Sequence, residues 1–308
     1  MMKVFLKKTL LLVAVISLAV LTACGGSDDG NDGETEENAT VNYNEAVDHT
    51  ITGIEPGAGI TVTTEKAIEE YEELSGWDLE ISSTAAMMSE LEKAIDNEDP
   101  IIITGWNPHW MFAKYPDMKY LDDPKNVYGD EEGINTLTRL GLEDDMPEAY
   151  KILDQFEWDV EDMESIMNEA NETGEEIETI AEQWVKDNED KVATWTEGVD
   201  DVDGIDFELV STPWDSERAS SGVLKVAMEQ KGFNVTVTPV DVAIVFESVA
   251  NGDVDATIAA WLPYTHKDFY ENNKDDLNDL GPNLVGAKIG LVVPEYMDID
   301  SIEDLEAK

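Results

Sequence analysis

Four short segments of the chain combine tryptophan or glycine with turn residues, at points where an apolar run breaks into a loop. They are residues 53–60, 104–110, 211–217 and 260–266. Three of them carry a tryptophan close to the break: Trp106, Trp214 and Trp261. A lone tryptophan is more often a core residue, but these positions allow the rings to face a cleft. Because indole faces attract positive charge and glycine permits close approach to the backbone, the segments are candidates for a binding site.

The sequence offers little for catalysis. It contains no GxSxG elbow, no phosphate-binding loop and no HExxH motif, and it has three scattered histidines and one cysteine. Residues 200–204 resemble a calcium loop, but with Gly204 at the sixth position the first and twelfth positions are Val199 and Val210. Neither can ligate calcium through its side chain. We therefore expect a binding protein with no enzyme activity, no metal site and no cofactor. Two other functional classes are kept as alternatives: an enzyme, and an acidic surface protein with a structural or calcium-buffering role.

The elements that must position these segments follow an α/β pattern, in which short β-branched runs alternate with amphipathic stretches from residue 49 onward. Strands are expected at residues 50–54, 79–81, 101–104, 206–210, 234–239, 256–260 and 288–293. Helices are expected at residues 64–74, 85–97, 220–231 and 242–249, and consecutive helices, including 161–171 and 175–187, between 147 and 195. The four segments lie at the carboxyl ends of expected strands, where open α/β sheets bind ligands.

The N-terminus has the features of a secreted lipoprotein. Residues 1–23 begin with basic residues, continue with an apolar run and contain no acidic residue. Because the apolar run is too short to span a bilayer as a helix, the segment is predicted to be a signal peptide. The run ends in the bacterial lipoprotein pattern at Cys24, the single cysteine, so we expect Cys24 to be acylated. Residues 24–48 predict a flexible acidic tether. The protein is therefore expected to be extracytoplasmic and anchored to the cell membrane by lipid.

The charge is strongly negative. The chain has 70 acidic and 19 basic residues, a net charge of −51, which becomes −54 when the three lysines of the signal peptide are removed. This balance excludes nucleic-acid binding, because such a field repels phosphate backbones. Acidic residues spread over the whole chain favour a protein that stays soluble at high salt, and hence halophilic adaptation.

Taken together with residues 122–125 and 281–284, the four segments resemble the glycine betaine-binding subunits of ABC importers. The resemblance extends from about residue 50 to 308. It implies an α/β, bilobed periplasmic-binding-protein-like (type II) fold with the ligand cleft between two lobes. The order of the two halves is that of the circularly permuted subgroup, which implies one lobe at about 49–120 plus 286–308 and another at about 121–285.

The resemblance also implies roles for six residues. Three match an aromatic cage around a trimethylammonium group: Trp106, Trp214 and Trp261. Three match the site of the ligand carboxylate, two through backbone N–H groups and one through its imidazole: Gly59, Ile60 and His266. A quaternary ammonium has no N–H to donate, so ring faces suit it better than hydrogen-bond acceptors. A helix that begins near Thr61 would direct its free N–H groups at an anion.

The implied function is capture of glycine betaine, or a related osmolyte such as proline betaine, for osmoprotective uptake. Choline and carnitine are alternatives, although choline lacks the anion. The implied partners are a membrane permease and its ATPase, and the chain is expected to act as a monomer.

Other residues near the implied cage have less specific expected roles. Asp215 and Glu217 are expected to cap the helix at Ser220 or to bridge the lobes rather than to perform acid–base chemistry. An anion site built from backbone suits this acidic chain, because a side-chain carboxylate in the cleft would repel the carboxylate of the ligand. His109 and Trp110 are expected to fix the loop behind Trp106, with support of the ligand-contacting residues as the alternative. The remaining tryptophans are expected to pack in the core or between helices: Trp77, Trp158, Trp184 and Trp195.

Overall fold

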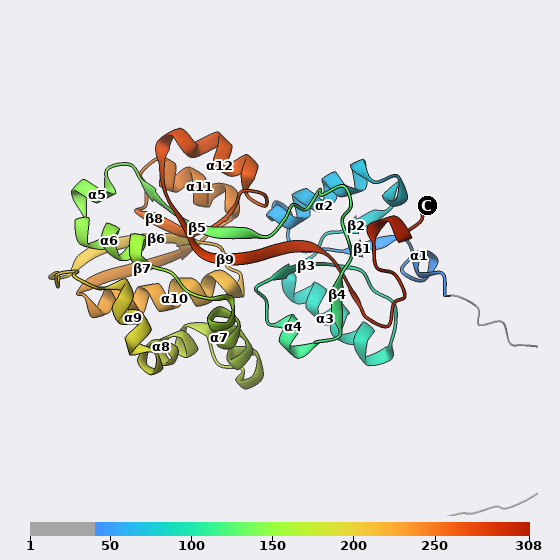
Figure 1. Cartoon of the computed structure of the whole chain (residues 1–308), viewed down its shortest axis with the longest axis horizontal. Coiled ribbons are helices and arrows are strands. Elements are labelled where there is room, and N and C mark those ends of the chain that lie inside the picture. The colour runs from blue at the N-terminus through green and yellow to red at the C-terminus, as the bar shows by residue number, and fades with distance from the viewer. Residues whose placement is uncertain (1–40) are drawn as a thin grey trace, which may run out of the picture. The chain divides into compact units, whose positions relative to one another are not determined.

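The structure is a computed structural model and describes residues 41–308 (Figure 1). The predicted signal peptide (1–23), the acylated Cys24 and the tether as far as residue 40 lie outside the described residues. Among residues 41–308, no helix has the length and apolar character needed to cross a membrane.

The last residues of the expected tether are held against the folded chain. Helix α1 (Tyr43–Ala46) begins after Asn42, whose side chain accepts hydrogen bonds from backbone N–H groups of its first turn. The side chain of Asn44 is buried and accepts the backbone N–H of Glu306 at 3.0 Å. The folded part therefore begins earlier than residue 49, because α1 is joined to the C-terminal segment.

Within residues 41–308, eight strands pair along one continuous path in the order β2-β1-β3-β9-β5-β8-β6-β7, and a ninth, β4, pairs with β9. Their bounds are β1 (Thr50–Thr52), β2 (Asp78–Glu80), β3 (Ile103–Asn107), β4 (Met118–Tyr120), β5 (Glu132–Arg139), β6 (Ile205–Ser211), β7 (Phe233–Pro239), β8 (Ala256–Leu262) and β9 (Leu277–Pro294). β1 runs parallel to β2 and β3, and β6 runs parallel to β7 and β8, whereas β5 and β9 pair with their neighbours in the antiparallel sense.

The long strand β9 links two groups of strands (Figure 1). Its residues up to Ala287 pair with β5, and those from Lys288 on pair with β3 and β4. We call β1–β4 with helices α1–α4 the first lobe, and β5–β8 with helices α5–α12 the second lobe. β9 contributes to both sheets, so a single strand passes between the lobes.

Helices cover both sheets. In the first lobe, α2 (Gly59–Glu70), α3 (Thr84–Asn97) and the short α4 (Met111–Lys114) accompany α1. The second lobe has α5 (Leu142–Asp145), α6 (Pro147–Gln155), α7 (Val160–Thr173), α8 (Ile177–Asp187), α9 (Glu189–Trp195), α10 (Asp215–Gln230), α11 (Val242–Ala250) and α12 (Lys267–Asn273). In Figure 1, α7–α10 lie below the second sheet and α11 and α12 above it.

All seven predicted strands occur, and the consecutive helices between 147 and 195 are confirmed as α6–α9. The sequence reading missed β4, β5 and the first half of β9. The missed part of β9 contains Gly281, Pro282 and Gly286, residue types depleted from strands, and its pairing with β5 carries register shifts. Helices α2 and α10 begin earlier than expected, at Gly59 and Asp215.

The four tryptophans expected in the core are confirmed there. Trp77, Trp158 and Trp195 are buried, and Trp184 is partly buried against Trp158 and Trp195. Trp184 stacks on Trp195 with ring centroids 6.1 Å apart and meets Trp158 edge-on at 6.0 Å. These contacts fill the space between the helices of the second lobe that follow β5.

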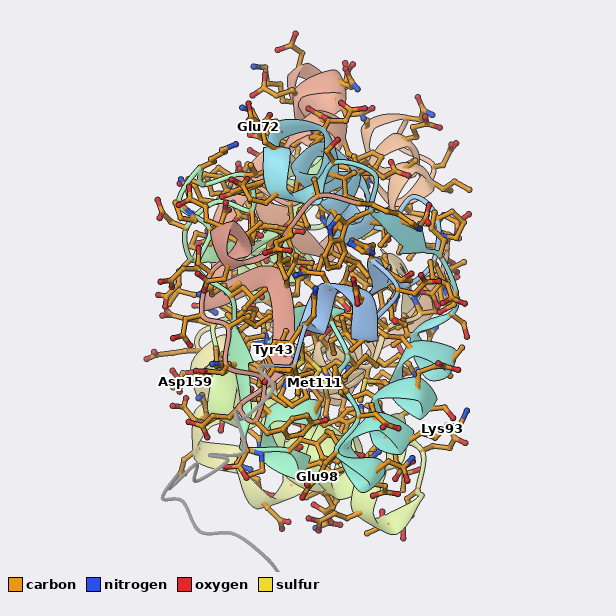
Figure 2. All side chains as sticks on the ribbon, turned by 90° about the vertical axis from the view of Figure 1, so that its right-hand side faces the viewer. Tyr43, Glu72, Lys93, Glu98, Met111 and Asp159 are labelled. Atoms are coloured by element: carbon orange, nitrogen blue, oxygen red, sulfur yellow. The ribbon has the colours of Figure 1, made fainter. Side chains whose placement is uncertain are left out.

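The surface of the described residues carries acidic side chains on every side of the view in Figure 2, where oxygen-tipped sticks surround the outline. Glu72, Glu98 and Asp159 are exposed examples at its top, bottom and left. The acidic excess of the sequence is therefore distributed over the folded domain rather than gathered in one segment.

Candidate functional site

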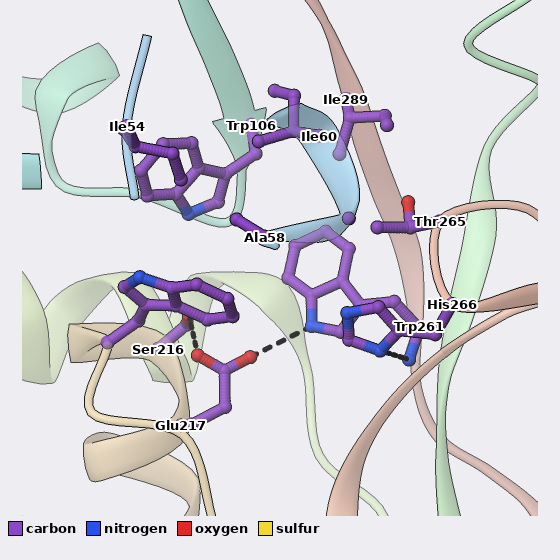
Figure 3. Close-up of a pocket in the computed structure, with 12 residues that line it drawn as sticks. Ile54, Ala58, Ile60, Trp106, Ser216, Glu217, Trp261, Thr265, His266 and Ile289 are labelled. Carbon is purple, nitrogen blue, oxygen red and sulfur yellow. Dashed lines mark hydrogen bonds between the residues drawn. The ribbon is translucent and has the colours of Figure 1, made fainter. Parts of the chain in front are cut away.

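The six residues implied by the resemblance all line one cavity, in which both lobes take part. Its volume is about 340 Å³, the open mouth included. The cavity is lined by Ile54, Ala58, Gly59, Ile60, Trp106, Trp214, Ser216, Glu217, Trp261, Thr265, His266 and Ile289. Figure 3 shows Trp106, Ala58 and Ile60 on one side and Glu217 with Trp261 on another.

Each of the three tryptophans lies where a strand gives way to a loop. Trp106 is in the last residues of β3, Trp261 is in the last residues of β8, and Trp214 lies between β6 and α10. Because the rings come from different strands and from both lobes, side chains far apart in sequence meet at one cavity. Trp106 and Trp261 are buried, and Trp214 is partly buried.

The indole N–H groups of two of these rings are held by carboxylates. Trp261 Nε1 donates to Glu217 Oε1 at 2.8 Å, and Trp214 Nε1 donates to Glu55 Oε2 at 3.4 Å. Glu55 also accepts the backbone N–H of Thr84, at the start of α3, at 2.9 Å. With the ring edges fixed in this way, the ring faces are left for contact across the cavity.

His109 and Trp110 fix the loop that follows Trp106, as expected. The ring of His109 meets Trp106 edge-on, with centroids 4.7 Å apart and planes at 76°. His109 Nδ1 accepts the backbone N–H of Met111 at 3.0 Å, and burial lowers the pKa of His109 to about 3, so the ring is neutral. Trp110 Nε1 donates across the lobes to Asp215 Oδ2 at 3.1 Å, which confirms a bridging role for Asp215.

At the opposite side of the cavity, helix α2 presents its first turn. The N-cap residue Ala58 provides no side-chain hydrogen bond, and within residues 41–308 the backbone N–H groups of Gly59 and Ile60 have no recorded partner. Gly59 is closely covered: a Cβ added there would lie 2.4 Å from Thr265 Cγ2 and 2.8 Å from the Thr265 carbonyl oxygen. Only glycine allows the two lobes to approach this closely.

The buried imidazole of His266 has its tautomer set by one hydrogen bond. Its Nδ1 accepts the backbone N–H of Trp261 at 3.1 Å, and burial lowers its pKa to about 3, against a weaker opposing effect of the backbone of Ala259. The neutral ring therefore carries its proton on Nε2. Its Cδ2 edge faces Gly59, since a Cβ built on Gly59 would lie 3.0 Å from that atom.

A buried glutamate that the sequence reading missed holds the loop before His266. Glu132, at the start of β5, accepts the backbone N–H groups of Tyr264 at 2.9 Å and Thr265 at 3.1 Å, and also the Thr265 hydroxyl. Burial raises the pKa of Glu132, and the bonds from Thr265 and Tyr264 oppose this rise. Glu132 thus joins the missed strand β5 to the wall of the cavity.

The expectation that Glu217 caps the helix or bridges the lobes is wrong, and its carboxylate lines the cavity instead. Glu217 lies in the first turn of α10, is fully buried, and lines the cavity. It neither caps the helix nor bridges the lobes; it accepts hydrogen bonds from Trp261 and Ser216. No local pattern reveals its burial, because the small residues that follow at 219–222 point to all sides of the helix and do not mark one face.

Comparison with known proteins identifies the family. The chain matches the family described as the substrate binding domain of ABC-type glycine betaine transport systems over residues 33–187 and 207–308. The chain belongs to this family. As a member of the ABC-type glycine betaine substrate-binding family it is a binding protein rather than an enzyme, and it acts outside the cytoplasm with a permease and an ATPase.

One relative of this glycine betaine-binding family is the glycine betaine/carnitine transport binding protein GbuC of Listeria monocytogenes serotype 1/2a (strain 10403S). It is 46% identical over 303 residues, which is 97% of this chain and 98% of the relative. Among solved structures, lactococcal OpuAC in its closed form with glycine betaine is 48% identical over 48% of this chain and 58% of its own, with a TM-score of 0.47. A choline-binding protein in complex with choline is 24% identical over 62% of this chain and 61% of its own, with a TM-score of 0.44.

The predicted α/β, bilobed, type II binding-protein fold is confirmed, whereas the circular permutation stays a prediction. Within residues 41–308, no group of three or more His, Cys, Asp or Glu side chains is placed to hold a metal ion. The groups that line the cavity are ring faces, backbone N–H groups, one neutral imidazole and one carboxylate.

Proposed function

We propose that the chain captures glycine betaine in the cavity between its lobes and delivers it to the importer. Family membership supports the ligand class. The single observation that carries the assignment of the site is that three indoles and a helix N-terminus with an imidazole share one cavity.

The proposed orientation places the trimethylammonium group among Trp106, Trp214 and Trp261. Their edges are fixed by neighbouring groups, so the faces are preorganised for a methylated cation. Each desolvated cation–π contact contributes about 1–2 kcal/mol. Nonpolar contact between the methyl groups and the rings adds to this attraction.

The ligand carboxylate would then accept hydrogen bonds from the backbone N–H groups of Gly59 and Ile60 and from Nε2 of His266. The positive end of the α2 dipole favours an anion at this position. Each such charge-assisted bond contributes about 1.5–3 kcal/mol. Choline, which has a hydroxyl in place of the carboxylate, would lose most of this contribution.

Carnitine is the second candidate, because the name of the 46% identical relative includes it and because carnitine carries the same two charged groups. Its longer backbone separates the charges further than in glycine betaine. Proline betaine, with its cation inside a ring, tests the width of the cage.

We also propose how the domain is placed in the cell. Acylation at Cys24 would anchor the chain to the membrane after removal of residues 1–23, and the acidic segment that follows would serve as a tether. We propose that the domain acts as a monomer in a salt-rich environment, in the circularly permuted arrangement with lobe boundaries near residues 121 and 286. Replacement of Cys24 by Ser should release the protein from the membrane fraction.

Isothermal titration calorimetry with glycine betaine, proline betaine, carnitine and choline tests the function directly. We expect glycine betaine to bind more tightly than choline, and Trp106→Ala, Trp214→Ala and Trp261→Ala each to weaken its binding by about tenfold or more. Thermal unfolding of the ligand-free variants checks that the fold survives. If all three variants bind glycine betaine like the parent, the cage assignment is wrong.

A further inference from the structure

Glu217 occupies an unusual place for an acidic side chain in a protein of charge −51. Its exposed fraction is 3%, and it forms part of the cavity wall. Oε1 accepts the indole N–H of Trp261 at 2.8 Å, and Oε2 accepts the hydroxyl of Ser216 at 2.6 Å (Figure 3). Both oxygens are therefore held, and the carboxylate is fixed beside a cage ring.

No lysine or arginine among the described residues lies within ion-pair distance of Glu217. Arg218, the next residue on α10, pairs with Glu176 and Glu178, and Lys225 pairs with Glu229. Around Glu217 the charged and titratable groups are Asp215, Arg218, Lys225 and Glu229 of α10, Glu178 and Glu182 of α8, and the neutral His266. A buried carboxylate without a counterion is costly, because the hydrogen bonds from Trp261 and Ser216 replace only part of the hydration that burial removes.

We propose that Glu217 is a specificity-determining carboxylate whose counterion is the quaternary ammonium group of the ligand. The proposal rests on the proposed function and deepens it. No basic side chain of the described residues pairs with Glu217, so the bound cation would be its counterion. A quaternary ammonium cannot donate a hydrogen bond, so it attracts the carboxylate by charge alone and leaves the bonds to Trp261 and Ser216 intact.

The position of Glu217 also resolves the conflict with the negative end of the ligand. The carboxylate adjoins Trp261, whereas the proposed anion site is formed by the first turn of α2 and by His266. Repulsion by Glu217 disfavours the reversed orientation, in which the ligand carboxylate would lie among the rings. A hydrogen bond from the indole N–H to a charged acceptor further increases the electron density of the ring face that meets the cation.

The test compares glycine betaine with 3,3-dimethylbutanoate, in which carbon replaces the charged nitrogen at nearly the same shape. Glu217→Gln keeps an acceptor for Trp261 but removes the negative charge. Calorimetry should show that the variant binds glycine betaine roughly 10- to 100-fold more weakly, because one partner of a desolvated charge pair is neutral. The affinity for 3,3-dimethylbutanoate should stay the same or increase, so the preference of the protein for the cation shrinks.

Two further variants separate charge from structure. Glu217→Asp shortens the side chain but keeps the charge. It should lower the affinity for both ligands, while the ratio of the two affinities changes by less than about threefold. Glu229→Gln removes the same charge from an exposed position of the same helix, and screening should leave both affinities unchanged.

The outcomes distinguish the two levels of the proposal. Absence of glycine betaine binding in the parent protein overturns both the proposed function and the role of Glu217. If the parent binds glycine betaine and Glu217→Gln keeps the parent's preference over 3,3-dimethylbutanoate, Glu217 has only a structural role and this inference fails alone. If Glu217→Gln unfolds, loss of the preference in Glu217→Asp decides against the inference.

Discussion

Trp110 and Asp215, which belong to opposite lobes, are joined by a hydrogen bond of 3.1 Å from the indole Nε1 to the carboxylate Oδ2. Trp110 follows β3 in the first lobe, and Asp215 begins α10 in the second. Both residues adjoin cage positions in sequence or in space. Neither residue lines the cavity, but the bond joins the two lobes next to it. It can form only when the lobes are close together.

Trp110→Phe removes the donor of this bond and keeps most of the ring. We expect the affinity for glycine betaine to fall by about tenfold, because a hydrogen bond to a charged group stabilises the closed form by ~1.5 kcal/mol. Titration calorimetry measures the loss, and small-angle X-ray scattering should show a larger fraction of open molecules at limiting ligand.

A second bridge between the lobes provides the control. Lys66 of α2 pairs with Asp268 of α12 at 3.0 Å, but their side chains are 51% and 67% exposed. Because exposed ion pairs contribute little, Lys66→Ala should change the affinity by less than about threefold. A larger loss in Lys66→Ala than in Trp110→Phe would contradict the assignment of the Trp110–Asp215 bond as the stronger latch.

Gly59→Ala should abolish tight binding without loss of stability. The new methyl group would lie 2.4 Å from Thr265 Cγ2 and 2.8 Å from the Thr265 carbonyl oxygen, so the lobes could not close. In the open form the same change should stabilise α2 by up to about 1 kcal/mol, since alanine is the better helix former. Calorimetry and thermal unfolding of the ligand-free protein measure the two effects separately.

The neighbouring Gly57 gives the opposite pattern. It has a φ of +83° and nothing within 4 Å of an added Cβ, so Gly57→Ala meets backbone strain but no obstruction. We expect a loss of about 1 kcal/mol in stability. If Gly59→Ala binds glycine betaine as tightly as the parent, the added methyl group does not prevent closure, and the expected clash with Thr265 is wrong.

His266→Asn should discriminate between glycine betaine and choline. Asparagine can replace Nδ1 as acceptor for the backbone N–H of Trp261, but it cannot replace the Nε2 donor. Glycine betaine should therefore lose about 10- to 100-fold in affinity, the effect of one charge-assisted bond, whereas choline should lose little. Equal losses for the two ligands would show that His266 supports the loop and does not meet the carboxylate.

The parts of the site that were predicted from sequence share one physical property. Trp106, Trp214 and Trp261 lie where apolar strands break into loops, and the parallel strands of each sheet end at one edge. Local pattern therefore placed them at loops where a cleft could lie, and the resemblance to the family supplied their meeting in one cage. For the anion site, the pattern gave a glycine-containing turn before a helix, and the resemblance singled out Gly59 and Ile60.

The two buried glutamates could not be found by such reasoning. Glu132 and Glu217 are two of 70 acidic residues, and only long-range packing buries them. Glu132 belongs to β5, whose partners β8 and β9 lie more than a hundred residues away in sequence. Burial of a polar side chain is decided by such distant neighbours, so composition and periodicity carry little information about it.

The affinity for glycine betaine should fall as the pH is lowered, because of Glu217. Burial raises the pKa of this carboxyl in the ligand-free protein, and the nearby charge of Asp215 adds to the rise. A cation beside Glu217 favours the ionised form and lowers this pKa on binding. The affinity is then fully present above the raised pKa of the ligand-free protein and is lost as the pH falls through it.

Calorimetry between about pH 5 and pH 8 measures this profile, and proton release on binding appears as a dependence of the heat on the ionisation enthalpy of the buffer. His266 does not contribute, since its pKa is about 3. Glu217→Gln should flatten the profile and, by removing a buried charge, stabilise the ligand-free protein at neutral pH. Asp215→Asn keeps an acceptor for Trp110 and should shift the profile to lower pH without flattening it, because the charge of Asp215 adds to the raised pKa of Glu217. A profile that stays steep in Glu217→Gln would assign the proton to another group.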